Sequence, residues 1–308
     1  MMKASVVIPT YNKLSRLKLV LESLKYQNEK EENYEVILVD DGSNDGTKEY
    51  IEAEKFPFQL IYCAQNNCGR ASARNLGVCN AKYDIIIFTD DDLILDANFI
   101  HNHIKHHKNK EQIVHGRIMS LTFTKFFLDP TKGTFLKGLQ VRESIRKSLM
   151  SQRILPDMLK KENFDENIAR KSKMTSLESV TKLLLEQQPG TMDWISFVGG
   201  NISVPKNVFK DAQGFDEKFG LKWGCEDIEL GYRLFQKGYQ FCYADEAVNY
   251  HISHYRQDFI HEHEINVRYF YTKYRDERIN LFHKFISKKI SKEEFLKQIC
   301  RKGLILQK

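Results

Sequence analysis

Short β-branched runs alternate with segments of helical periodicity over the first hundred residues, and this alternation constrains the fold more than any other feature. The β-branched runs are residues 5–8, 35–39, 59–62 and 85–88, and residues 14–24, 44–53 and 71–81 lie between them. In the first helical segment, Leu14, Leu17, Leu21 and Leu24 fall on one face. The order βαβαβαβ predicts an α/β fold with a doubly wound, mostly parallel sheet.

Polar or acidic residues follow three of these predicted strands. PTYN (9–12) follows the first, DDGS (40–43) the second and DDD (90–92) the fourth. Because ligands bind at the carboxyl ends of the strands in such sheets, the three clusters are expected on one rim. Carboxylates that converge there need a cation or a ribose to relieve their repulsion. Three aspartates exceed what capping a following helix requires, and they suit Mg²⁺ or Mn²⁺ held against a diphosphate.

The rest of the chain divides by composition. Residues 1–254 are expected to form the main domain, with a first half (1–110), a lysine-rich helical insertion or lid (120–190) and a second half (191–254). Residues 255–308 form a predicted helical C-terminal tail that is aromatic and basic, with 13 Lys and Arg against 7 Asp and Glu. No nucleic-acid recognition signature accompanies this charge, so we expect no nucleic-acid partner. Contact with a protein or an anionic membrane through the tail stays open.

Cysteine usage and the N-terminus bear on the compartment. The six cysteines contain no CxxC pair, which favours reduced thiols. The N-terminus does not resemble a signal peptide, and no apolar run approaches the roughly 18 residues of a spanning helix. We therefore expect a cytoplasmic protein, with peripheral attachment to the inner face of the membrane left open.

Four motifs together resemble a known family. SVVIPTYNK, ILVDDGSNDGT, NNCGRASARNLGV and DIIIFTDDD resemble the nucleotide-binding half of the inverting family-two glycosyltransferases with the GT-A fold. A second block, FVGGNISVPKNVFKDAQGFDEKF followed by WGCEDIELGYRL, resembles the acceptor-side half and includes the WGxED element of galactosyltransferases. Residues 120–190 and the tail lie outside this resemblance.

The resemblance implies a UDP-sugar donor and assigns residues to its base. Pro9, Thr10 and Tyr11 would line the base pocket, and Asp41 would receive the uracil imide. Two structural alternatives stay open, a core aromatic for Tyr11 and a turn-forming aspartate for Asp41.

Other residues would contact the phosphates and the donor sugar. Arg70 and Arg74 suit phosphates or base, because a guanidinium pairs two oxygens at once. A helix that begins near Gly69 would add to the preference for an anion. Gly200 and Asn201 would turn the chain tightly beside the sugar, where glycine permits close backbone approach.

The acidic triplet corresponds to the family's DxD motif. By resemblance, Asp90 lies on the ribose or metal side, Asp91 contacts the nucleotide sugar or the metal, and Asp92 binds Mn²⁺ or Mg²⁺. The choice between Asp91 and Asp92 as metal ligand is left open. His251 matches the position of a third metal ligand in many relatives and is preferred over His254.

The WGCED segment would form the second centre. In an inverting transfer a base must lie across the sugar from the metal, and a carboxylate suits that role. The resemblance makes Asp227 the base, with Glu226 and Trp223 holding the acceptor or the donor sugar. The simpler alternative is that Glu226 and Asp227 only open a helix.

These residues predict a metal-dependent hexosyltransferase that moves a sugar from a nucleotide diphosphate sugar to a glycan, lipid-linked or peptide acceptor, as in bacterial polysaccharide biosynthesis. The rival function is a catalytically idle scaffold or partner subunit that binds a nucleotide sugar. His101, His103, His106 and His107 lack an acidic partner in sequence and are expected to be solvated or packed on a helix.

Overall fold

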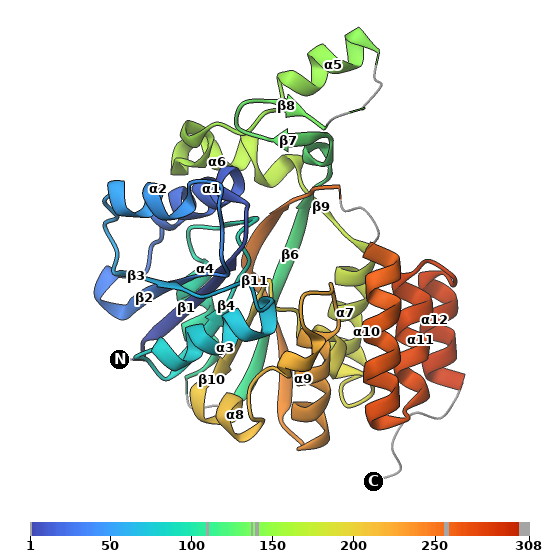
Figure 1. The fold of residues 1–308 in the computed structure, drawn as a ribbon. Coiled ribbons are helices and arrows are strands. Elements are labelled where there is room, and N and C mark those ends of the chain that lie inside the picture. Colours follow the sequence, from blue (N-terminus) through green and yellow to red (C-terminus); the bar gives the residue numbers. More distant parts are fainter. Residues whose placement is uncertain (1, 109–110, 137, 139–141, 256–258, 302–308) are drawn as a thin grey trace.

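The computed structural model describes residues 2–108, 111–136, 138, 142–255 and 259–301. One large sheet runs through the molecule in the order β3-β2-β1-β4-β10-β6-β11-β5, and β9 pairs with β6 beside this path. Helices cover the sheet, as Figure 1 shows. The α/β fold class predicted from the sequence is confirmed.

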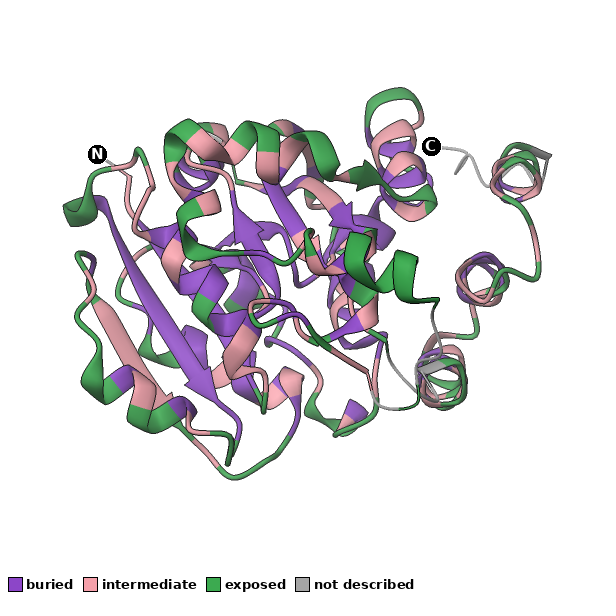
Figure 2. Cartoon of the chain, turned by 90° about the horizontal axis from the view of Figure 1, so that it is seen from above, coloured by how far each residue is buried: buried purple, intermediate pink, exposed green. Residues whose placement is uncertain are grey.

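The first half of the sheet is parallel and matches the predicted alternation. Its strands are β1 (Ala4–Thr10), β2 (Tyr34–Asp40), β3 (Leu60–Ala64) and β4 (Ile85–Phe88), and the helices between them are α1 (Leu14–Leu24), α2 (Thr47–Ala53) and α3 (Arg70–Asn80). Alternate residues of β1 enter different cores. Val7 packs in a core with α3, whereas Val6 and Ile8 pack in a core with α1. Figure 2 shows the buried strands between more exposed helices.

The second half of the sheet is mixed. It contains β5 (Leu93–Leu95), β6 (Gln112–Leu121), β10 (Ile202–Pro205) and β11 (Gln240–Ile252), with α4 (Phe99–His106), α8 (Lys206–Asp211) and α9 (Glu226–Gln236). Strand β10 runs antiparallel to both β4 and β6, while β6 and β11 are parallel. Short 3₁₀ helices lie at Glu31–Asn33, Thr122–Phe126, Pro156–Leu159, Ala169–Lys171, Asp193–Ser196 and Glu217–Phe219.

The insertion is less helical than the sequence predicts. It contains β7 (Phe127–Asp129), β8 (Thr134–Phe135), α5 (Glu143–Met150), α6 (Lys161–Asn167), β9 (Lys173–Met174) and α7 (Ser176–Gln187). The predicted helices at 141–150 and 176–186 correspond to α5 and α7, although residue 141 lies outside the described residues. Because β9 pairs with β6, part of this segment belongs to the main sheet. Its role as a lid stays a prediction.

The tail forms the predicted helices, which pack against the rest of the protein. They are α10 (Phe259–Tyr274), α11 (Glu277–Ile286) and α12 (Lys292–Arg301), side by side next to α7 and α9 in Figure 1. One apolar cluster joins Trp194 and Ile228 to Phe270, Phe282 and Phe295. The aromatic residues of the tail therefore complete a core. No helix in the described ranges has the length and apolarity that a membrane crossing requires.

Candidate active site

The carboxyl ends of β1, β2 and β4 meet at a cavity of about 1160 Å³. It brings together most of the residues predicted from the sequence: Pro9, Thr10, Tyr11, Asp41, Arg70, Asp90, Asp91, Asp92, Gly200, Trp223 and His251. His254 lines it as well. Four predicted residues, Arg74, Asn201, Glu226 and Asp227, are not among its lining residues. The expected convergence of three polar clusters on one rim is what the structure shows.

The three aspartates of the triplet have different partners. The Thr10 hydroxyl donates to Asp91 Oδ2 at 2.9 Å, and Lys13 Nζ lies 2.7 Å from Asp92 Oδ2 and 3.3 Å from Asp91 Oδ1. Burial raises the pKa of Asp91 to about 6, against the opposing effect of Lys13. Although burial has the same effect at Asp92, Lys13 and the nearby histidines hold its pKa well below the usual range. Asp92 is therefore the more strongly anionic of the two.

Two histidines approach Asp92 from the end of β11. His251 Nε2 lies 3.8 Å and His254 Nδ1 3.4 Å from Asp92 Oδ2. The Ile252 N–H donates to the backbone carbonyl of Asp92 at 2.8 Å, which fixes the two segments together. One ligand atom from each of Asp92, His251 and His254 lies within 4.8 Å of the others. A carboxylate with two imidazoles is a donor set that fits Mn²⁺.

Arg74 is placed differently from the expectation that it contacts donor phosphates. Its side chain is 1% exposed; Nη2 donates to Asp90 Oδ1 at 2.8 Å and Nη1 to Glu226 Oε1 at 3.1 Å. A Cβ at Gly199 would lie 2.4 Å from Arg74 Cζ, so the glycine leaves room for the guanidinium. Arg74 thus ties the acidic triplet to the start of α9, and Arg70 is the arginine that lines the cavity.

Replacing Arg74 with alanine should lower the free energy of unfolding by about 3–5 kcal/mol, because the buried Glu226 and the half-buried Asp90 would lose their shared cation. Urea denaturation followed by circular dichroism measures this change. The matched control is Arg170→Ala, which breaks an ion pair whose side chains are 75% and 67% exposed and should change stability by less than about 0.5 kcal/mol. Equal effects of the two substitutions would contradict a central role for Arg74.

Glu226 and Asp227 form the first turn of α9, as the helix-opening alternative expects. Burial opposes ionisation of Glu226, but Arg70 and Arg74 lower its pKa. Asp227 accepts hydrogen bonds from the Gly199 and Ile228 N–H groups at 3.1 and 2.8 Å. Burial and the neighbouring Glu226 raise the pKa of Asp227 to about 6. A carboxyl group that titrates near neutrality suits proton transfer.

Asp41 lines the cavity and also stabilises the loop before α3. Its carboxylate accepts from Gln65 Nε2 at 2.6 Å and from the N–H groups of Cys68 and Gly69 at 2.9 and 2.8 Å. These bonds use three of about four lone-pair sites and shape the loop before α3. Tyr11, in contrast, is 46% exposed, so the core-aromatic alternative for it is wrong.

Asn201 does not reach the cavity. Its side chain is buried, donates to the carbonyls of Arg117 and Ala247, and contacts His103 through Oδ1. The turn predicted at this point is present, since Asn201 N–H bonds the Val198 carbonyl. Gly200 faces the site: a Cβ there would lie 3.5 Å from Asp90 Oδ2.

Two of the histidines at α4 are packed, as expected, whereas the other two have acidic partners that the sequence does not indicate. His103 and His107 are buried against Ser203, whereas His101 and His106 pair with Glu29 and Glu246. Lys13 is the notable residue that the sequence does not single out. Its only sequence signal is its position after PTYN, because its partners lie 78 and 79 residues away.

Comparisons with known proteins agree with this geometry. Residues 5–160 match the family described as glycosyl transferase family 2, and residues 185–257 match the N-terminal domain of galactosyltransferase. The uncharacterized glycosyltransferase YfnE of Bacillus subtilis is 33% identical over 265 residues, which cover 82% of this chain and 65% of YfnE. The chain spans 24% to 65% of the length of several curated relatives that it matches.

Solved structures share the fold at low identity. The TarS 1–349 complex of S. aureus with UDP-GlcNAc has a TM-score of 0.52 at 19% identity, over 88% of this chain and 66% of that one. The mannosyltransferase PcManGT of Pyrobaculum calidifontis, in complex with GDP-Man and Mn²⁺, has a TM-score of 0.54 at 14% identity, over 99% and 70%. Together with the family matches and the shared fold, the cavity at the strand ends leads to one conclusion: the chain belongs to glycosyl transferase family 2, with a second half like that of galactosyltransferases.

Proposed function

We propose that this protein transfers a sugar from a nucleotide diphosphate sugar, most simply a UDP-sugar, to a hydroxyl group of a glycan, lipid-linked or peptide acceptor. The observation that carries the proposal is the grouping of Asp92, His251 and His254 on a cavity that Pro9, Thr10 and Tyr11 also line. The complexes of TarS with UDP-GlcNAc and of PcManGT with GDP-Man and Mn²⁺ support it by analogy of fold.

The donor would lie along the β1, β2 and β4 ends. Pro9, Thr10 and Tyr11, which line the cavity, would border the base, while Asp41 holds the loop before α3. Arg70 at the start of α3 and Lys13 on the rim supply positive charge for phosphates.

A divalent cation would be held by Asp92 together with His251 and His254. Mn²⁺ or Mg²⁺ bound there would neutralise charge on the departing diphosphate. Lys13 Nζ lies 2.7 Å from Asp92 Oδ2, which supports a cationic partner for this carboxylate. Asp91 is held by Thr10 and is the weaker candidate ligand.

The acceptor would enter from the side of Trp223 and α9. Asp227 would take the proton from the attacking hydroxyl. With its pKa raised to about 6, Asp227 is mostly ionised at neutral pH and binds a proton more strongly than an ordinary aspartate does. Attack from the face opposite the diphosphate gives inversion at the anomeric carbon. Arg74 fixes the distance between the two centres because it bonds both Asp90 and Glu226.

Isothermal titration of UDP with and without Mn²⁺ tests the proposal. We expect Mn²⁺ to tighten UDP binding by about tenfold or more, since the diphosphate and Asp92 would share the cation. A screen of nucleotide sugars for Mn²⁺-dependent hydrolysis then identifies the donor. UDP binding that does not change with Mn²⁺ would contradict the proposed metal dependence. UDP binding without hydrolysis of any nucleotide sugar would favour a catalytically inactive protein that only binds the nucleotide sugar.

A further inference from the structure

The loop at residues 222–225 is held in an unusual backbone conformation by a helix of the tail. Gly224 and Cys225 have φ values of 94° and 73°, and Gly220 just before has a φ of 62°. Left-handed conformations in succession, one of them at a residue with a side chain, persist only where the surroundings impose them. This loop carries Trp223 into the cavity wall and leads directly into Asp227.

Two side chains from the first turns of α10, those of Asn266 and Glu262, bind the backbone of this loop, and a third contacts the Trp223 ring. Asn266 Nδ2 donates to the Lys222 and Gly224 carbonyls at 3.1 and 2.8 Å, and Glu262 Oε2 accepts from the Trp223 N–H at 3.2 Å. His263 lies against the Trp223 ring, with centroids 5.4 Å apart. Asn266 is 3% exposed, so its two bonds are shielded from water.

The same helix also reaches the substrate cavity. Glu262 lines the cavity, as do Tyr255 before the helix and Lys288 after α11. On the opposite side the residues just before the loop abut the donor rim, since a Cβ on Gly69 would lie 2.2 Å from the Gly220 carbonyl oxygen. The chain from Gly220 to Cys225 therefore contacts the donor rim at its start and α10 at its end.

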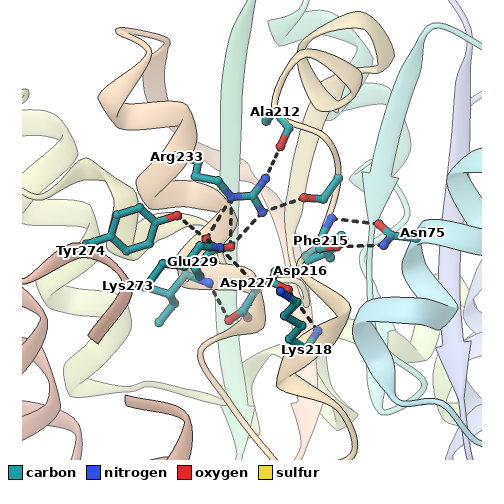
Figure 3. A network of polar contacts seen from close by, with 12 residues as sticks. Asn75, Ala212, Phe215, Asp216, Lys218, Asp227, Glu229, Arg233, Lys273 and Tyr274 are labelled. Atoms are coloured by element: carbon teal, nitrogen blue, oxygen red, sulfur yellow. Dashed lines mark hydrogen bonds and ion pairs between the residues drawn. The ribbon is translucent and has the colours of Figure 1, made fainter. Parts of the chain in front are cut away.

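The far end of α10 is anchored to α9, the helix that begins with Glu226. Figure 3 shows Lys273 and Tyr274 of α10 meeting the carboxylate of Glu229, which Arg233 also contacts. Glu229 is fully buried. Lys273 further bonds Asp216 at 2.8 Å. These contacts fix the C-terminal end of α10 relative to α9. The residues at the N-terminal end of α10 that bind the loop therefore belong to a helix held in a fixed position.

We propose that α10 is part of the acceptor-binding machinery, with Asn266 and Glu262 as positioning residues that hold the 222–225 loop and thereby place Trp223 and Asp227. This inference rests on the proposed function, because it assigns the acceptor side of the same site. In this proposal the tail forms a wall of the cavity and is more than an appended basic segment.

The fluorescence of Trp223 provides a test that does not depend on activity. The chain has two tryptophans, and the other, Trp194, is fully buried. In Asn266→Ala and Asn266→Asp, subtraction of the matching Trp223→Phe spectra isolates the Trp223 signal. We expect its acrylamide quenching constant to rise by at least about twofold, because a loop without its hydrogen bonds opens more often. Asn266→Asp keeps the side-chain size but loses both donors, so it should behave like the alanine variant.

Measurements of donor binding and donor hydrolysis distinguish loss of loop positioning from a general loss of structure. Affinity for UDP with Mn²⁺ should change by less than about threefold, while kcat for donor hydrolysis falls by about tenfold at unchanged donor KM. The control is Asn280→Ala on α11, a half-buried asparagine bonded only to Glu277 among described contacts, which should leave all three readouts unchanged. Unaltered quenching in both Asn266 variants, or a parallel loss of UDP affinity, would overturn the inference. Absence of Mn²⁺-dependent UDP binding in the wild type would instead overturn the proposed function.

Discussion

Replacing Asp227 with asparagine should reduce sugar transfer by about a hundredfold to ten-thousandfold while UDP and Mn²⁺ still bind. This expected loss of rate equals the contribution of a general base to catalysis, which is about a hundredfold to ten-thousandfold. Asparagine preserves the shape and can still accept one of the two backbone hydrogen bonds that Asp227 receives from Gly199 and Ile228. Single-turnover kinetics with the donor found by screening, and titration of UDP, measure the two properties separately.

The pH dependence of the transfer rate is a second test of Asp227 as the base. Because the pKa of Asp227 is raised to about 6, the carboxyl group is protonated below that pH and cannot accept a proton from the acceptor. The rate should rise as pH increases through about 6 and then level off. The asparagine variant should lose this dependence on Asp227.

Asp211→Asn is the matched control for this substitution. Asp211 is a surface carboxylate of α8 that pairs with Lys237, and its removal should leave kcat within a factor of about two. If Asp227→Asn transferred sugar as fast as the wild type, the assignment of Asp227 as base would be wrong.

The first half of the fold is predictable because its signals are local. Residues 85–88 and 36–39 are continuous apolar runs, as expected for strands buried on both faces, and α1 has the predicted bounds Leu14–Leu24. The carboxyl ends of parallel strands meet by topology alone. The three polar clusters could therefore be assigned to one rim without knowledge of any contact.

Strand β6 is not predicted from the sequence and β11 is predicted only in part, for a physical reason. Strand β6 contains His115, which is buried with Glu178 in a polar network rather than in an apolar run. Strand β11 carries a register shift between Ala244 and Asn249, so its polar residues interrupt the pattern. A polar residue that is buried by a distant partner looks like a surface residue in the sequence.

Distant partners also explain why some site residues lie elsewhere than the sequence predicts. Arg74 was expected to be available to phosphates, but Glu226, 152 residues later, accepts its second hydrogen bond. The tail was expected to be an extension because it lies outside the family resemblance and carries an excess of basic residues. Its Phe270, Phe282 and Phe295 nevertheless enter a core with Trp194, since apolar positions on helices can be interleaved with exposed lysines.

Asp92→Asn should weaken Mn²⁺-dependent UDP binding by about 100-fold or more. Loss of an outer-shell partner alone weakens a metal site by about 10- to 100-fold, and Asp92 is a proposed ligand. The substitution removes the carboxylate that His251, His254 and Lys13 all approach. Titration of Mn²⁺ in the presence of UDP measures the effect, and a variant that retained the full Mn²⁺ response would contradict the site.

The two histidines allow the ligand set itself to be resolved. If both bind the cation, His251→Ala and His254→Ala should each weaken the Mn²⁺ response, and the double variant should approach Asp92→Asn. The control is His106→Ala, which removes a histidine paired with Glu246 on the surface of α4 and should have no effect on Mn²⁺. A loss confined to His251→Ala would support the ligand preferred from the sequence, whereas a loss confined to His254→Ala would assign the third ligand to the histidine that lies closer to Asp92. Because all three side chains come from the adjacent β5 and β11 region, either result keeps the cation at the carboxyl end of β4, where the diphosphate is proposed to lie.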